Sequence, residues 1–417
     1  MLARWLESWG WRVPVAIVAA SAVLVVAAFA FAGGRSTHKP AATRVASRAD
    51  CVVRASGRFT GCGRLRAPTA AVQAADGPVK TAHQTASSPH RAQAPSAGDL
   101  GHQVGQMIMG GMTGRAPSAA LLARVRAGQV GGIILFGANI ATSAQVQAAT
   151  ASLQQAASAG GNPPLLIATD QEGGTVRRFQ SVAPTMSAAQ MGASGPRTAA
   201  NQGAATASGL RALGVNADLA PVADVPTSST NFLGTRAFSH TPGVVGATAC
   251  AFADALASGR VTPTLKHFPG LGAAGANTDS QAVTISLPLA ALRHAWTAYA
   301  RCAPGSDRMV MVSNAAYSSM TGRTPAVFSP ATYAALAGLG FHGVTISDSL
   351  EAGAVKAWAS KASTAAKAGL DIQLYTTETD AATAYQQLLA AANSNASLRS
   401  QVARSASKIR QLKQQVS

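Results

Sequence analysis

Short apolar runs alternate with alanine-rich helical stretches over residues 101–417, and this alternation limits the possible folds more than any other feature. Strands separated by helices pair in parallel, because each helix returns the chain to the starting edge of the sheet. At least seven such units over roughly 300 residues predict an α/β fold, a (β/α)8 barrel of the TIM type, with an open doubly wound sheet as the alternative. The expected strands are Val130–Phe136, Leu165–Thr169, Val215–Leu219, Thr262–Lys266, Met309–Ser313, Val344–Ser347 and Asp371–Tyr375. No eighth strand is assigned, and the run Met107–Met109 is interpreted as core.

The composition is that of a folded domain with a large core. Hydrophobic residues make up 47% of the chain and charged residues 12%, which argues against global disorder. The net charge is +18, but no tight run of Lys and Arg with interleaved aromatics occurs, so no nucleic-acid partner is expected. The last expected helix, Leu398–Val416, carries Arg404, Lys408, Arg410 and Lys413, which we interpret as a solvated basic face.

The region before the domain divides into two segments. Val13–Ala32 is an uncharged stretch long enough to span a bilayer, and Ala30–Ala32 also offers a small-x-small cleavage site. We therefore expect residues 1–34 to form an apolar membrane-anchoring helix, with cleavage and secretion as the alternative, and the domain to lie outside the cytoplasm in either case. Residues 35–100 are rich in Ala, Ser, Thr and Pro and are typical of a disordered linker. The catalytic domain then spans 101–417.

The chain has four cysteines, which allow three pairings that sequence alone does not distinguish. We expect Cys51 to pair with Cys62 in the linker, and Cys250 with Cys302 in the domain, because an oxidising compartment permits disulfides. No Cys-x-x-Cys or His-x-x-x-His spacing occurs, so neither a metal nor another cofactor is expected.

Acidic residues stand at the ends of several expected strands. Asp170 follows one strand, Asp348 follows another, and Asp218 and Asp224 flank the end of a third. An Asp in this place can simply cap the next helix. Several together, with Lys266 and His267 at a further strand end, favour an active site, because the carboxyl ends of barrel strands form the active-site mouth.

These motifs, in this order and spacing, resemble the N-terminal barrel of glycoside hydrolase family 3, in particular its single-domain bacterial β-N-acetylhexosaminidases, the β-N-acetylglucosaminidases. The most specific element is Lys266–Gly270, and Phe341–Leu350 resembles the nucleophile segment. The remaining matches are Gly131–Phe136 with Asn139, Asp170–Gly174 with Val176 and Arg177, Gly214–Asp224, Arg236–Ser239 and Ala368–Asp371.

The resemblance implies a role for each matched residue. Asp348 would be the nucleophile of a retaining glycosidase, while Asp170, Arg236, Lys266 and His267 would bind the sugar. Glu172 is interpreted as stabilising its turn, and the two glycines after it as allowing a close approach to neighbouring backbone. The implied substrate is a β-linked N-acetylhexosamine in cell-wall fragments or chito-oligosaccharides, and we expect a monomer.

One departure from the family concerns the proton donor. The family has an Asp-Ser-His triplet whose His is the acid/base, whereas this chain has Asp279-Ser280-Gln281, and Leu271 replaces another His. A glutamine side chain has no proton to exchange near neutral pH. Asp279, on a glycine- and alanine-rich loop expected to be mobile, is therefore the expected donor, with His240 as a substitute. The alternative is a degenerate barrel that binds amino sugars at the cell surface without cleaving them.

Overall fold

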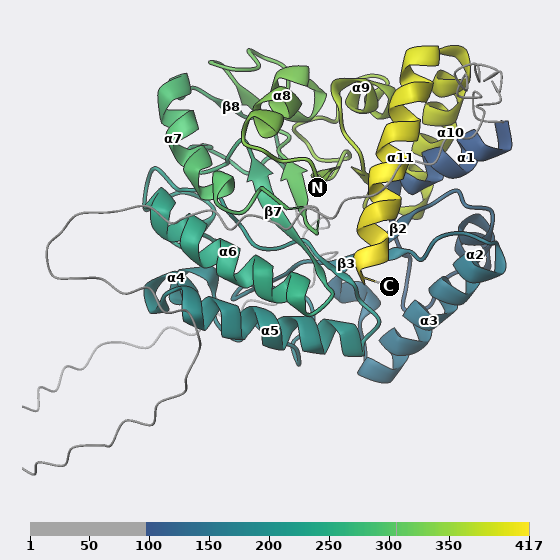
Figure 1. The fold of residues 1–417 in the computed structure, drawn as a ribbon, viewed down its shortest axis with the longest axis horizontal. Coiled ribbons are helices and arrows are strands. Elements are labelled where there is room, and N and C mark those ends of the chain that lie inside the picture. Colours follow the sequence, from purple (N-terminus) through teal and green to yellow (C-terminus); the bar gives the residue numbers. More distant parts are fainter. Residues whose placement is uncertain (1–96, 306, 417) are drawn as a thin grey trace, which may run out of the picture. The chain divides into compact units, whose positions relative to one another are not determined.

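The computed structural model describes residues 97–305 and 307–416. Within them, eight parallel strands form one sheet in the order β11-β9-β7-β6-β3-β2-β1-β12, surrounded by helices (Figure 1). A bridge between Ile346 and Ile372 joins the two edge strands and closes the sheet into a barrel, as predicted. The barrel strands are β1 (Ile108–Gly111), β2 (Gly132–Leu135), β3 (Leu166–Thr169), β6 (Ala217–Asp218), β7 (Thr262–Phe268), β9 (Met309–Val312), β11 (Val344–Ser347) and β12 (Gln373–Leu374).

Every residue of these eight strands is buried. Parallel sheets are covered on both faces, which is why their strands read as continuous apolar runs. Each of the seven expected strands is present, but β6 and β12 keep only two residues each. The strand that the apolar pattern did not predict is β1, whose two glycines interrupt the apolar run. A Cβ on Gly111 would lie 1.9 Å from the carbonyl oxygen of Thr376, so this strand needs glycine for a close approach of two backbones.

The helices begin at recognisable local signals. Ser118, Thr142 and Thr377 each accept a hydrogen bond from a backbone N–H in the first turn of the helix that follows. Proline occupies the first turn of α5, α6 and α8. The helices are α1 (Ala97–Gln106), α2 (Ala119–Arg126), α3 (Ser143–Ala159), α4 (Ala188–Ser194), α5 (Pro196–Ala212), α6 (Pro242–Ser258), α7 (Leu289–Ala300), α8 (Pro330–Gly338), α9 (Lys361–Ala368), α10 (Glu378–Ser394) and α11 (Ala396–Val416).

The interpretation of the last helix as a solvated basic face is wrong for two of its four cations. Arg404 and Arg410 are exposed, as expected. Lys413 is buried, and its Nζ donates to Gln106 Oε1 at 2.6 Å and to the carbonyl oxygen of Gly131 at 2.8 Å. Lys408 forms an ion pair with the buried Asp371 at 2.6 Å. These contacts hold α11 against the barrel.

The predicted disulfide between Cys250, in α6, and Cys302, just after α7, is present. The proposed Cys51–Cys62 pair, the apolar segment 1–34 and most of the linker lie outside the described residues. Across residues 97–416, apart from residue 306, no helix is both long and apolar enough to cross a membrane.

Candidate active site

A cavity of about 250 Å³ opens at the carboxyl ends of the barrel strands. Its wall includes side chains that follow or end β2, β3, β7, β9, β11 and β12. All six residues expected to act on the substrate line this one cavity: Asp170, Arg236, Lys266, His267, Asp279 and Asp348. The barrel brings them together because its strands are parallel and therefore end at the same rim.

A buried network of opposite charges forms one side of the cavity. Arg236 donates two hydrogen bonds to the carboxylate of Glu172, at 2.8 and 2.9 Å. Lys266 lies 2.6 Å from Glu172 Oε1 and 2.8 Å from Asp170 Oδ1. Burial alone would raise the pKa of Glu172, but attraction to Lys266 and Arg236 outweighs it and lowers the pKa to about 2. The network therefore stays charged at neutral pH.

Glu172 does more than stabilise its turn, so that interpretation is corrected. Its carboxylate fixes the two cations of the cavity wall, a role the sequence does not reveal because Arg236 and Lys266 lie far away in the chain. The expectation for the glycines after it is confirmed for Gly173. Gly173 has a φ of 93°, and a Cβ there would lie 2.2 Å from the carbonyl oxygen of Met186.

The arginine that reaches the cavity from β5 (Val176–Arg177) is Arg178, not Arg177. Successive side chains of a strand point to opposite faces, so Val176 and Arg178 line the cavity together. Arg177 instead donates to the carbonyl oxygens of Gln180 and Val182. Arg178 lies 3.6 Å from Asp170 Oδ2, and its Nε is buried with no hydrogen-bond partner among the described residues. The alternation with Val176 could have identified Arg178 from sequence.

His267 is oriented by a buried carboxylate. Its Nδ1 lies 2.8 Å from Asp224 Oδ2. The same carboxylate accepts hydrogen bonds from the backbone N–H of His267 and of Leu271, and from the Tyr299 hydroxyl at 3.2 Å. Burial would raise the pKa of Asp224, but His267 and the other donors lower it overall. Because a carboxylate accepts, Nδ1 carries the hydrogen and Nε2 is the ring nitrogen left for other partners.

A second buried carboxyl, Asp218 at the end of β6, lies beneath the charged network. Its Oδ1 accepts from the backbone N–H of Gln171 at 2.9 Å, while its Oδ2 has no hydrogen-bond partner within the described part of the chain. Burial raises the pKa of Asp218 to about 8, and the nearby Asp170 and Glu172 add to the effect. Burial therefore favours the neutral form of Asp218.

Asp348 follows β11 directly and is held by its backbone, whose N–H donates to the carbonyl oxygen of Val312 at 3.1 Å. Its Oδ1 accepts from the backbone N–H of Ser349 at 2.8 Å. Burial raises the pKa of Asp348, and the negative charge of Asp279 raises it further, while His267 and Lys266 act in the opposite direction. The charge of Asp279 therefore acts on the carboxyl group of Asp348.

The loop that carries Asp279 is fixed to the loop after β11. The carbonyl oxygens of Thr278 and Asp279 accept hydrogen bonds from the backbone N–H groups of Ala354 and Gly353, at 3.0 and 2.9 Å. Asp279 already lines the cavity in this arrangement. Gln281, at the position of the family's His, is exposed and is not among the residues that line the cavity.

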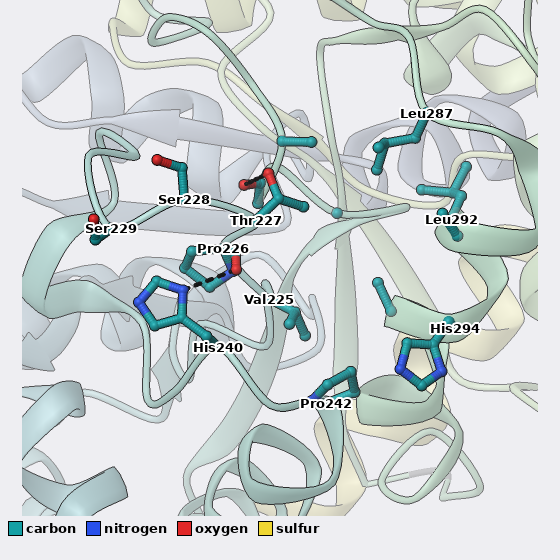
Figure 2. A pocket seen from close by; sticks show the side chains of 15 residues that line it. Val225, Pro226, Thr227, Ser228, Ser229, His240, Pro242, Leu287, Leu292 and His294 are labelled. Atoms are coloured by element: carbon teal, nitrogen blue, oxygen red, sulfur yellow. Dashed lines mark hydrogen bonds between the residues drawn. The ribbon is translucent and has the colours of Figure 1, made fainter.

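His240, the substitute proton donor, lies in a different cavity, of about 620 Å³, between the loops after β6 and β7 (Figure 2). Its Nδ1 donates to the carbonyl oxygen of Pro226 at 2.9 Å. This second cavity is lined by Gly270, Gly272 and Ala273. Leu271, which lies between them in the chain, instead lines the cavity that contains Asp348. The segment 270–273 therefore separates His240 from Asp348.

Comparisons with known proteins identify the family of this chain. The model of the glycosyl hydrolase family 3 N-terminal domain matches residues 99–412. The chain is 36% identical over 289 residues to a protein of Arthroderma benhamiae named "Uncharacterized secreted glycosyl hydrolase", covering 66% of this chain and 82% of that protein. It is 32% identical over 261 residues to a β-hexosaminidase of Xylella fastidiosa strain M12, covering 60% of this chain and 76% of that enzyme.

Two solved structures show the same barrel. A family 3 β-N-acetylglucosaminidase from a Paenibacillus species superposes with a TM-score of 0.72 at 29% identity, over 76% of this chain and 63% of that one. A β-N-acetylhexosaminidase from Beutenbergia cavernae superposes with a TM-score of 0.68 at 30% identity, over 76% of this chain and 98% of that one. The chain thus spans less than two thirds of the Paenibacillus protein and nearly all of the Beutenbergia protein.

Proposed function

Because the chain belongs to glycosyl hydrolase family 3 and is similar to its β-N-acetylhexosaminidases, we propose that it removes a terminal β-linked N-acetylhexosamine from a glycan with retention of configuration. The observation that carries the proposal is the single cavity that Asp348 and Asp279 line together with Asp170, Arg236, Lys266 and His267. We propose that the glycan is a chito-oligosaccharide or a cell-wall fragment.

The proposed reaction has two steps. The carboxylate of Asp348 attacks the anomeric carbon, the bond to the leaving oxygen breaks, and Asp279 gives that oxygen its proton. A water molecule then attacks the covalent glycosyl ester, Asp279 takes a proton from the water, and Asp348 is released as a carboxylate. Each step transfers one proton and makes one bond for each that breaks, so the residues end as they began.

The charged network would hold the sugar before and during these steps. Asp170 accepts hydrogen bonds from sugar hydroxyls, Arg236 and Lys266 donate at other positions of the ring, and His267 accepts through Nε2. We add Arg178 to this group, since its Nε is buried and has no partner of its own in the described chain. A buried polar group without a partner costs free energy, and a bound hydroxyl would remove that cost.

We further propose that the enzyme acts outside the cytoplasm. The disulfide between Cys250 and Cys302 supports this, because disulfides persist mainly in oxidising compartments. The name of the Arthroderma relative, a secreted protein, agrees with it. Protease added to intact cells should remove the domain if it is displayed there, whereas a protected full-length chain would contradict the proposal.

The deciding experiment uses the full-length chain and a panel of nitrophenyl β-glycosides, together with a fluorinated glycosyl substrate that traps the covalent intermediate. We expect nitrophenol release from the N-acetylglucosaminide and a label on Asp348. Asp348→Asn should abolish both, and Asp254→Asn, which changes an exposed carboxylate on α6, should abolish neither. A label on another residue would overturn the assignment of the nucleophile.

One observation supports a second candidate function, the binding of amino sugars without cleavage. The residue at the position of the family's acid/base is Gln281, and it is exposed. A barrel without a proton donor would still bind amino sugars through Asp170, Arg236 and Lys266. Saturable binding of N-acetylglucosamine with no turnover of any aryl glycoside would favour this binding function over the enzyme.

A further inference from the structure

The loop between β11 and α9 displays a tryptophan. Trp358 has 37% of its surface exposed, and only one other large hydrophobic side chain in the described chain, that of Val244, is comparably exposed. Trp296 is the second tryptophan of this part of the chain. It is buried and donates to the carbonyl oxygen of Pro269. The two tryptophans therefore have different roles, and the packing of the core does not account for Trp358.

The ring of Trp358 packs against a second aromatic ring. Its centroid lies 5.0 Å from that of Phe328, with 33° between the ring planes. Phe328 is buried at the end of the short 3-10 helix η4 (Ala326–Phe328). The backbone N–H of Trp358 donates to the carbonyl oxygen of Val355 at 3.0 Å. The ring is thus fixed by an aromatic contact and a tight turn, and it offers solvent a rigid apolar surface.

The place of this surface is set by the neighbouring loop. Gly353 and Ala354, a few residues before Trp358, donate to the carbonyl oxygens of Asp279 and Thr278. A Cβ on Gly353 would lie 2.3 Å from the carbonyl oxygen of Ser280, so the two loops are in direct contact. The four residue steps from Ala354 to Trp358 span at most about 14 Å, and tight turns shorten that distance. Trp358 is therefore on the loop that contacts the Asp279 side of the cavity, although it is not among the residues that line the cavity.

This side of the cavity is where the leaving group departs. In the proposed reaction Asp279 protonates the leaving oxygen, so the rest of the substrate must pass out of the cavity beside Asp279. The C–H face of a pyranose ring is apolar and flat, and an aromatic ring fixed in place matches it. We propose that Trp358 is a stacking platform for a sugar ring of the leaving group, and that the substrate is an oligosaccharide rather than a simple glycoside. This inference rests on the proposed function and extends it beyond the bond that is cleaved.

The test compares two substrates with the full-length protein. Nitrophenyl N-acetylglucosaminide has no second sugar, while chitotriose has two sugars beyond the bond to be cleaved. We expect Trp358→Ala to raise KM for chitotriose about threefold to tenfold, the range of one aromatic contact, and to leave KM for the nitrophenyl glycoside within about twofold. Trp358→Phe keeps a ring and should recover most of the loss. Val244→Ala, which removes the other exposed hydrophobic side chain, should change neither value.

Binding measurements separate this inference from the proposed function. Chitotriose binding is measured by calorimetry in Asp348→Asn and in the same variant carrying Trp358→Ala, so that no turnover is needed. A threefold to tenfold weaker affinity in the double variant supports the platform even if the protein never cleaves a glycoside. Equal affinities, an equal change for both substrates, or no chitotriose binding by the single variant would each overturn the platform. Matching melting curves for all variants exclude a loss of folding as the cause.

Discussion

The negative charge of Glu172 should stabilise the charged side chains of the cavity wall. Replacing Glu172 with its neutral isostere, glutamine, tests this directly. Glu172→Gln keeps the size of the side chain but leaves Arg236 and Lys266, both largely buried, with one anionic partner fewer. Because the isostere still offers one oxygen as an acceptor, the change removes charge more than contact. We expect a large loss of stability together with a higher KM, since both cations also face the cavity.

The size of the effect follows from the pKa. Folding lowers the pKa of Glu172 from 4.5 to about 2. A shift of this size corresponds to about 3 kcal/mol at neutral pH, at about 1.36 kcal/mol for each pKa unit. Breaking a buried ion pair by removing one partner typically costs about 3–5 kcal/mol, which agrees.

The same shift fixes the pH dependence. A carboxyl group whose pKa is lowered by folding stabilises the protein above its unfolded pKa, and this stabilisation is lost as the pH falls towards the folded pKa. The stability gap between the parent and Glu172→Gln should therefore be about 3 kcal/mol at pH 7 and about 1 kcal/mol at pH 3.

Urea denaturation followed by circular dichroism at pH 7 and at pH 3 measures this gap. Asp254→Asn is the matched control, because the Asp254 carboxylate is exposed and its ion pair with Arg308 should contribute at most about 1 kcal/mol. A gap below about 1 kcal/mol at pH 7 would contradict the role given to Glu172. So would a gap that does not narrow at pH 3.

Four further substitutions probe other buried or catalytic groups. Asp279→Ala should slow cleavage of natural disaccharides by about 10²–10⁴-fold and of glycosides with good leaving groups far less, and Gln281→His should raise activity on poor leaving groups. Equal losses on both substrate types would limit Asp279 to shaping the cavity. Asp218→Asn should be more stable than the parent at pH 8 and equally stable near pH 4. The reason is that folding raises the pKa of Asp218 to about 8, so this carboxyl group increasingly opposes folding as the pH rises between these values. A stability difference between the two proteins that does not change with pH in urea denaturation would contradict this. Burial lowers the pKa of Lys413 to about 7, so the stability of the parent should rise between pH 7 and pH 9. Thermal melts of Lys413→Met should show a smaller rise in melting temperature over the same pH range.

The barrel and most of its active-site rim follow from the sequence alone. Apolar runs separated by helices require parallel strands, and parallel strands end on one rim, so the pattern by itself places Asp170, Lys266 and Asp348 together. The exact lengths of the strands could not be predicted, because the hydrogen bonds that define them depend on neighbours far away in the chain. β1 was not predicted because Gly111 is required by its close approach to the backbone of Thr376. No local sequence pattern reveals that contact.

The pairing of the charged side chains, in contrast, depends on the tertiary structure. Glu172 and Arg236 are 64 residues apart, and Lys413 meets Gln106 across 307 residues, so their contacts leave no trace in local periodicity. The same holds for His240, which the segment 270–273 separates from the catalytic cavity although its chemistry suited a proton donor. Residue type and spacing specify which groups reach the rim of the barrel. The path of each loop decides which of them meet, because an ion pair or a hydrogen bond forms only when the fold has already brought both partners within a few ångströms.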